Sequence, residues 1–187
     1  IEKPKIPPSN LAVTGIYFLT PKIFDVIKKL KPSWRKELEI TEALQLLMDS
    51  GLDIHHDYVT GWWKDTGTPK DILHANQLIL ESLKNQENGI FIGDNCIISS
   101  DAKIMGPVII GDNCTVGSTT VLGPNVSIGK NSHLKNCNIK NSIVMDDCVI
   151  CAPIKIIDSI ISDGTEIKNN NSDESVYLLG ERSKITI

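Results

Sequence analysis

Three short groups of charged residues in the first third of the chain have side-chain types that bind ions and anionic substrates. Glu2-Lys3-Pro4 places a carboxylate beside an ammonium group, and the run Arg-Lys-Glu-Leu-Glu-Ile-Thr at 35–41 crowds four charges ahead of an expected helix. In the run Trp-Trp-Lys-Asp-Thr-Gly at 62–67, an acid is followed by glycine at the end of an expected strand. Taken singly, each group is more simply explained as a solvated terminus, a charged helix entry or an ordinary turn. Their meaning therefore depends on the elements around them.

Residues 1–84 are predicted to form a mixed α/β segment that positions these groups. Strands are expected at 12–18, 53–60 and 62–64. Helices are expected from Thr20-Pro21, from Thr41 to Gly51, and from Thr68-Pro69, since a capping residue or a proline marks each start. The polar stretch 85–89 is predicted to be a linker. The pattern is typical of the last part of a larger, Rossmann-like sheet domain.

In this order and spacing, the motifs resemble those of sugar-1-phosphate nucleotidyltransferases. The resemblance rests on Glu-Lys-Pro at 2–4, Ser-Asn-Leu-Ala-Val-Thr-Gly-Ile-Tyr-Phe at 9–18, the 35–41 run, and Trp-Lys-Asp-Thr-Gly-Thr at 63–68. It is most specific in residues 1–75. The whole chain is similar to the long-form glucose-1-phosphate thymidylyltransferases, in which a β-helix follows the catalytic domain and the chain ends in a segment like 179–184.

The resemblance implies a role for each matching residue. Glu2 would bind sugar hydroxyls, and Lys3, helped by Arg35, would bind the sugar phosphate. Asp65 would hold the catalytic Mg²⁺, a cation that prefers carboxylate and phosphate oxygens. The implied catalytic residues are Lys3, Arg35 and Asp65. The implied substrate-binding residues are Glu2, Lys3, Val13, Gly15, Tyr17, Arg35 and Glu37.

The reaction implied by the resemblance is attack of glucose 1-phosphate on the α-phosphorus of dTTP, which gives dTDP-glucose and pyrophosphate. An enzyme that uses UTP or another hexose phosphate is one alternative, and a bifunctional nucleotidyltransferase/acetyltransferase is another. Lys36 departs from the family pattern, which usually has glycine there. The family's Gly-rich nucleotide-binding loop, which precedes Glu-Lys-Pro, is not found in these 187 residues. We therefore expect a C-terminal fragment that is inactive by itself.

A period of six organises the second half of the chain. A helix would repeat at three and four and a strand at two, whereas six fits a left-handed parallel β-helix of hexapeptide repeats with three flat sides. The expected inward aliphatics are Ile92, Ile98, Ile104, Ile110, Val116, Leu122, Ile128 and Leu134. The small inward residues are Cys96, Ala102, Val108, Cys114, Thr120, Val126, Ser132 and Asn138. The register slips after Leu134 and resumes at Val144, so this domain is expected to span 90–187, with a cap formed by 175–180 and 184–187.

Two features of the repeats have spacing or chemistry of interest but plainer explanations. His133 directly precedes the inward Leu134, so we expect a surface residue rather than the general base of an acetyltransferase. Cys148 and Cys151 have C-x-x-C spacing, but a zinc site needs four ligands and the sequence has no second pair. The five cysteines are therefore expected to be unpaired packing residues, which agrees with a reducing compartment.

Composition excludes several classes of partner. The chain is 41% hydrophobic and 22% charged, with a net charge of −4 and a pI near 5.6, so it has no general attraction for nucleic acid or anionic membranes. No apolar run approaches the roughly 18 residues of a membrane span, and no signal peptide is recognisable. We expect a cytoplasmic protein with small-molecule substrates, and the β-helix leaves room for a homo-oligomer.

Overall fold

The computed structural model describes residues 4–84 and 87–168. The chain divides into two compact units, Ile1–Trp63 and Lys64–Ile187, and each is described by itself. Within the described ranges, no helix is both long enough and apolar enough to cross a membrane. The predicted cap at 175–180 and 184–187 lies outside the described residues.

Two helices form the core of the first unit. α1 (Lys22–Ile27) follows Pro21, and α2 (Ile40–Asp49) ends shortly before Gly51, whose φ of 78° suits glycine. Both helices were expected at these places, with bounds that differ by one or two residues. Their buried side chains are Ile23, Ala43 and Leu47.

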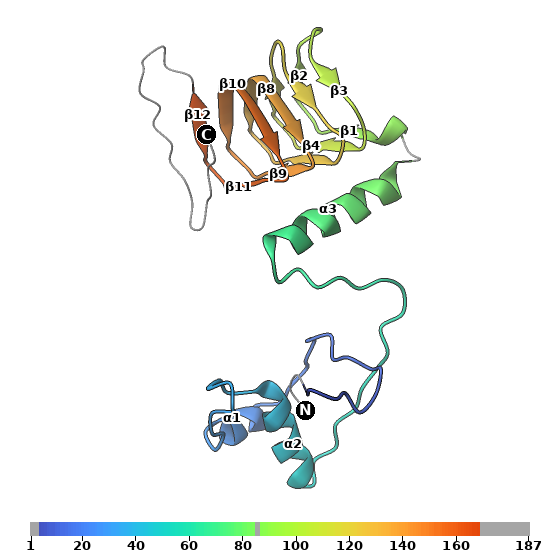
Figure 1. Cartoon of the computed structure of the whole chain (residues 1–187), viewed down its shortest axis with the longest axis vertical. Coiled ribbons are helices and arrows are strands. Elements are labelled where there is room, and N and C mark those ends of the chain that lie inside the picture. The colour runs from blue at the N-terminus through green and yellow to red at the C-terminus, as the bar shows by residue number, and fades with distance from the viewer. Residues whose placement is uncertain (1–3, 85–86, 169–187) are drawn as a thin grey trace. The chain divides into compact units, whose positions relative to one another are not determined.

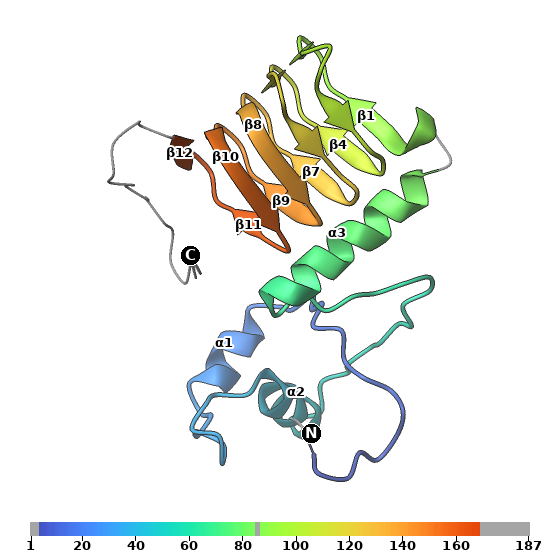
Figure 2. The same ribbon diagram turned by 45° about the horizontal axis from the view of Figure 1, so that its top comes forward.

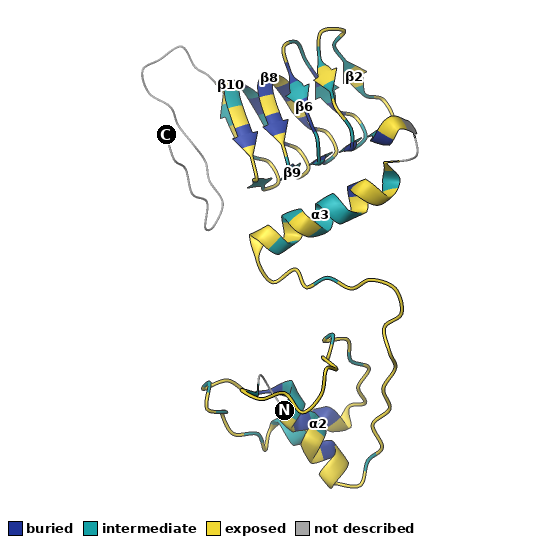
Figure 3. Cartoon of the chain, turned by 45° about the vertical axis from the view of Figure 1, so that its right-hand side comes forward, coloured by how far each residue is buried: buried dark blue, intermediate teal, exposed yellow. Residues whose placement is uncertain are grey.

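Strands were predicted at 12–18, 53–60 and 62–64. The structure has no strand at these positions, all of which it describes, so this prediction was wrong. These segments have no regular secondary structure. A strand is stabilised by hydrogen bonds to a neighbouring strand, and no described segment pairs with them. Their apolar side chains are correspondingly exposed: Val13 by 67%, Phe18 by 98% and Trp62 by 64% (Figure 3).

The second unit is a left-handed parallel β-helix with α3 (Pro69–Leu83) and the short helix η1 (Glu87–Gly89) before it (Figure 1). Side one consists of β1 (Ile90–Ile92), β4 (Val108–Ile110), β7 (Val126–Ile128), β9 (Ser142–Val144) and β11 (Ile160–Ile161). Side two contains β2 (Ile97–Ile98), β5 (Thr115–Val116) and β12 (Glu166–Lys168), and side three contains β3 (Lys103–Ile104) and β6 (Val121–Leu122). The long strands β8 (His133–Lys140) and β10 (Val149–Ile157) turn a corner and contribute to both of the latter sides.

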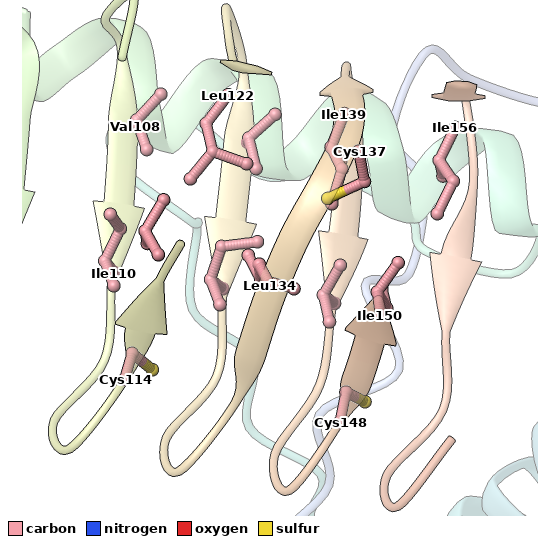
Figure 4. Close-up of a cluster of buried hydrophobic side chains, with 14 residues drawn as sticks. Val108, Ile110, Cys114, Leu122, Leu134, Cys137, Ile139, Cys148, Ile150 and Ile156 are labelled. Carbon is pink, nitrogen blue, oxygen red and sulfur yellow. The ribbon is translucent and has the colours of Figure 1, made fainter. Parts of the chain in front are cut away.

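The predicted aliphatics stack in three columns, as the parallel registers require (Figure 4). Ile110, Val116, Leu122, Ile128 and Leu134 are at most 2% exposed. In the first coil, burial is less complete than the repeat predicts. Ile92 is 46% exposed, because a residue in a terminal coil has a neighbouring coil on one side only.

The register slips after Leu134, as predicted, and the repeat that follows is one residue shorter than six. Ile139, not a residue six positions on, pairs with Leu122 and is fully buried. Cys137 therefore occupies the small inward position at 3% exposure, while Asn138, which was predicted to face inward, is exposed.

Asparagine and aspartate form one corner of the β-helix. Asn95, Asn113, Asn131 and Asp147 all have φ between 56° and 58°, a left-handed conformation that these short polar residues tolerate. The amide Nδ2 of Asn113 donates to Oδ1 of Asn131 at 3.2 Å, and Nδ2 of Asn131 donates to Oδ1 of Asp147 at 3.0 Å. The corner side chains thus hydrogen-bond from coil to coil.

Helix α3 packs against side one of the β-helix (Figure 2). Leu80 is buried at 1% exposure, and Oγ of Ser127 on β7 donates to Oδ1 of Asn76 at 2.6 Å. Thr68 and Pro69 begin this helix as predicted, with the Thr68 hydroxyl accepting from the backbone N–H of Asp71. Residues 64–84, which the sequence places in the first domain ahead of a linker at 85–89, thus pack with the β-helix in the structure.

Candidate active site

A five-residue loop, 64–68, carries Asp65 and directly precedes α3. Both ends of the loop are held by Asp71 in the first turn of α3. Nζ of Lys64 donates to Oδ1 of Asp71 at 2.6 Å, and the hydroxyl of Thr68 donates to Oδ2 at 2.6 Å. The hydrogen bond from Lys64, followed by that from Thr68, lowers the pKa of Asp71 below its ordinary value.

The Asp65 carboxylate forms a local turn and leaves one oxygen open. Oδ1 accepts a hydrogen bond from the backbone N–H of Gly67 at 3.0 Å, which is the contact expected of an ordinary Asp turn. Within residues 4–84 and 87–168, Oδ2 accepts no hydrogen bond and the residue is exposed. An exposed carboxylate oxygen is a suitable ligand for Mg²⁺, whose other ligands are commonly water and substrate phosphates. Three or more His, Cys, Asp or Glu side chains do not gather into a metal-binding group anywhere in those ranges.

Arg35 lies in the first unit between two carboxylates. Its Nη2 atom lies 2.9 Å from Oε2 of Glu37, and its Nη1 atom lies 3.4 Å from Oε1 of Glu39. Glu39 is buried at 6% exposure and also accepts from the hydroxyl of Ser33 at 2.8 Å. This buried carboxylate fixes the orientation of the guanidinium. Sequence reasoning did not single out Glu39, although its position four residues after Arg35 is a spacing at which opposite charges pair.

The loop that carries Arg35 makes a tight turn at Lys36. Lys36 has φ of 62°, in the left-handed region that favours glycine. Its backbone N–H donates to the carbonyl of Ser33 at 2.8 Å, and the N–H of Ser33 donates to the carbonyl of Glu37 at 2.9 Å. The turn therefore requires a positive φ whichever residue is present, which explains why glycine would suit this position.

The remaining predicted sugar-site residues are described in part. Val13 is 67% exposed, Gly15 has φ of 76°, and Tyr17 is half-buried. Glu2 and Lys3 lie outside the described residues. Arg35 and Glu37 are brought together by their ion pair, whereas Asp65 belongs to the other compact unit.

The β-helix residues singled out in the sequence have structural positions. His133 is exposed on β8, as predicted. The five cysteines are free thiols, and those at the inward corner hydrogen-bond to the next coil. The thiol of Cys114, for example, donates to the carbonyl of Gly129 at 3.0 Å. Burial raises the pKa of Cys114 and Cys148, and it raises the pKa of Cys137 to about 11.

Comparisons with known proteins match the two halves of the chain separately. Residues 1–82 match the family model described as Nucleotidyl transferase, and residues 104–186 match the model described as GMPPB C-terminal domain. The first match contains all the charged groups described above, and the second covers most of the β-helix.

Curated relatives align with the whole chain or nearly all of it. The low-salt glycan biosynthesis nucleotidyltransferase Agl11 of Haloferax volcanii is 43% identical over 210 residues, which cover 100% of this chain and 56% of the relative. A glucose-1-phosphate thymidylyltransferase of Streptomyces antibioticus is 34% identical over 199 residues, covering 100% of this chain and 55% of the relative. A bifunctional sugar-1-phosphate nucleotidylyltransferase/acetyltransferase of Sulfurisphaera tokodaii is 36% identical over 203 residues, covering 98% of this chain and 50% of the relative.

The chain thus spans about half the length of the curated relatives that it matches. The motif order, the two charged loops, the β-helix and these matches agree with one another, and residues 1–82 belong to the nucleotidyl transferase family.

Proposed function

We propose that the polypeptide to which this chain belongs is a sugar-1-phosphate nucleotidyltransferase that makes dTDP-glucose from glucose 1-phosphate and dTTP. The observation that carries the proposal is that Arg35, Glu37 and Asp65 all lie in the segment that matches the nucleotidyl transferase family. The relatives from two Streptomyces species named glucose-1-phosphate thymidylyltransferase support the choice of substrates.

In this proposal Arg35 binds the sugar phosphate together with Lys3. A guanidinium presents several N–H donors in one plane and suits phosphate oxygens. Glu39 is buried and holds the guanidinium from one side, so less side-chain freedom is lost when a phosphate binds. Glu37 is more exposed, with 59% of its side chain accessible, and it competes with the phosphate for Arg35. Glu2 and the strip Val13, Gly15 and Tyr17 would contact the sugar.

Asp65 would hold the metal ion through its open Oδ2. When bound, Mg²⁺ would neutralise charge on the phosphates and so favour approach of two anionic substrates. The hydrogen bond from the Gly67 N–H engages Oδ1 and restrains the carboxylate, which leaves Oδ2 available for a cation. The positive side chains Lys3 and Arg35 would lower the repulsion between the sugar phosphate and the triphosphate.

A substrate panel on the full-length polypeptide that contains this chain tests the proposal. Pyrophosphate release would be measured with dTTP or UTP, each combined with glucose 1-phosphate or another hexose 1-phosphate, in the presence of Mg²⁺. We expect the highest kcat/KM for dTTP with glucose 1-phosphate. A preference for UTP or for another sugar would replace the substrates while keeping the reaction, and no pyrophosphate release with any pair would overturn the proposal.

A further inference from the structure

We propose that Asp71 and Lys64 form a positioning pair for Asp65, the candidate metal ligand: they close the 64–68 loop from both ends and fix where Asp65 presents its open oxygen. The proposal rests on the proposed function for the identity of the cation, and it concerns residues that neither the motif resemblance nor the comparisons assign to a site.

The geometry that carries the proposal is the use of both oxygens of one carboxylate. Oδ1 of Asp71 accepts from Nζ of Lys64, which directly precedes Asp65, and Oδ2 accepts from the hydroxyl of Thr68, three residues after Asp65. The backbone N–H of Asp71 donates back to the Thr68 hydroxyl at 3.2 Å. The loop is thereby tied at its first and its last residue to a single side chain on α3.

Inside this closure, Asp65 is restrained further by the Gly67 N–H. A Cβ built on Gly67 would lie 3.4 Å from Oδ1 of Asp65, so the carboxylate already lies against this backbone. A ligand held in place before the cation arrives binds it with less loss of freedom, which is the usual role of groups that surround metal ligands.

A competing explanation is that Asp71 is itself a cation ligand beside Asp65. Both of its oxygens already accept hydrogen bonds, and one donor is an ammonium group at 2.6 Å. A divalent cation at that carboxylate would face the positive charge of Lys64, whose side chain is only 23% exposed. The arrangement therefore suits a residue that positions Asp65 rather than a second cation ligand.

The positioning pair is itself held in place, because α3 packs against the β-helix. Leu80 is buried, and Asn76 accepts the hydrogen bond from Ser127 on β7. Asp71 lies on the same helix, five residues before Asn76. Helix α3 therefore links the position of the loop to the β-helix.

Lys64→Met is the decisive variant, because the two explanations of Lys64 predict opposite changes. If Lys64 acts on the cation only through its charge, removing that charge strengthens cation binding at Asp65. If Lys64 positions the loop, the same change weakens binding. Lys64→Arg keeps the charge and a hydrogen-bond donor and serves as the conservative rescue. Lys70→Met removes a positive charge from the first turn of α3 and is the matched control, since Lys70 takes part in no ion pair within the described ranges.

The experiment uses the 187-residue chain and Mn²⁺ as a paramagnetic probe. Broadening of the Thr66 and Gly67 amide signals would be followed by NMR as Mn²⁺ is added, with Asp65→Asn as the blank and thermal unfolding as the check on folding. We expect the midpoint to rise about 10-fold in Lys64→Met and in Asp71→Asn, in line with the effect of losing groups that orient metal ligands. Lys64→Arg should stay near wild type, and Lys70→Met should not raise the midpoint.

The outcomes separate this proposal from the proposed function. An unchanged or lowered midpoint in Lys64→Met, or no Asp65-dependent broadening in the wild type, would overturn the positioning role. A raised midpoint together with a full-length polypeptide that releases no pyrophosphate would keep the positioning role and remove the nucleotidyltransferase assignment. In an active full-length polypeptide, Lys64→Met should raise the apparent KM for Mg²⁺ about 10-fold, with a smaller change in kcat at saturating Mg²⁺.

Discussion

Ile110 and Ile128 occupy the same inward position on successive coils of the β-helix, in direct register between β4 and β7. Ile110 is 1% exposed and Ile128 is 2% exposed, so each covers the other from water. Stacking of this kind is the main source of stability in a solenoid, because each coil contacts only its neighbours.

Replacing Ile110 with Asp should therefore unfold the β-helix. The change removes a buried aliphatic side chain and leaves a carboxylate without a partner, at a cost of several kcal/mol. Ile97→Asp is the matched control, since Ile97 is 68% exposed on β2 and should tolerate the same change. Thermal unfolding followed by circular dichroism would compare the two, and equal melting temperatures would contradict the inward stacking of Ile110.

The buried thiol of Cys137 predicts a loss of stability at alkaline pH. Burial raises its pKa from 9.0 to about 11 in the folded state. Below pH 9 the thiol is protonated in both states and its contribution is fully present. As the pH rises from 9 to about 11 the unfolded chain loses the proton while the folded chain keeps it, so the free energy of unfolding falls by about 2 kcal/mol.

The measurement is urea unfolding at several pH values between 8 and 11 for wild type and Cys137→Ala. Lysines and tyrosines titrate in the same window, so only the difference between the two proteins reports on this thiol. We expect the wild type to lose more stability than Cys137→Ala across the window. Parallel curves would show that Cys137 is not shielded from ionisation.

Lys36→Gly should stabilise the first unit. A non-glycine residue at φ of 62° costs about 1–2 kcal/mol relative to its preferred conformations, and glycine avoids this cost at the expense of greater freedom in the unfolded chain. The net gain should be about 0.5–1 kcal/mol. Lys36→Ala removes the same side chain without relieving φ, so it should give no gain. A loss of stability in Lys36→Gly would mean that the Lys36 side chain, not the backbone, matters here.

Asp65→Asn should separate the turn contact from metal binding. Asparagine retains Oδ1 as an acceptor for the Gly67 N–H, so the melting temperature should stay within a degree or two. The loss of negative charge should lower kcat of the full-length polypeptide by at least about 10-fold at low millimolar Mg²⁺. Near-normal kcat across a Mg²⁺ titration would leave Asp65 with a turn role alone.

The β-helix was predictable because its period depends on a contact that repeats. Each inward residue meets its equivalent one coil away, so Val116 and Leu134 are aliphatic for the same physical reason. The slip at Ile139 was harder to place, because Asn138 and Cys137 are both small enough for the inward corner. Which of them faces inward depends on the pairing with β6, a long-range contact that the local pattern does not contain.

The first unit shows the opposite case. Helices α1 and α2 were predictable from capping and apolar spacing, which are local. Strand formation at 12–18 and 53–60 depends on a partner strand, and alternation alone does not provide one. The buried role of Glu39 was missed for a related reason. Its burial depends on the turn that brings Ser33 and Arg35 against it, and the spacing of four from Arg35 does not by itself establish that turn.

The register slip after Leu134 also shows where the β-helix accepts changes in chain length. The column on side one advances by 18 residues from Ile110 to Ile128, but by only 16 from Ile128 to Val144. The shorter coil stays in register because its corners at Asn136 and Asn141 each have one residue fewer than the corresponding corners at Thr119 and Asn125. Insertions and deletions can therefore be absorbed at corners while the flat sides keep their length. Peptide tags or whole loops grafted at a corner should leave the stacked interior intact, whereas a single residue inserted within a side would turn its next aliphatic toward water.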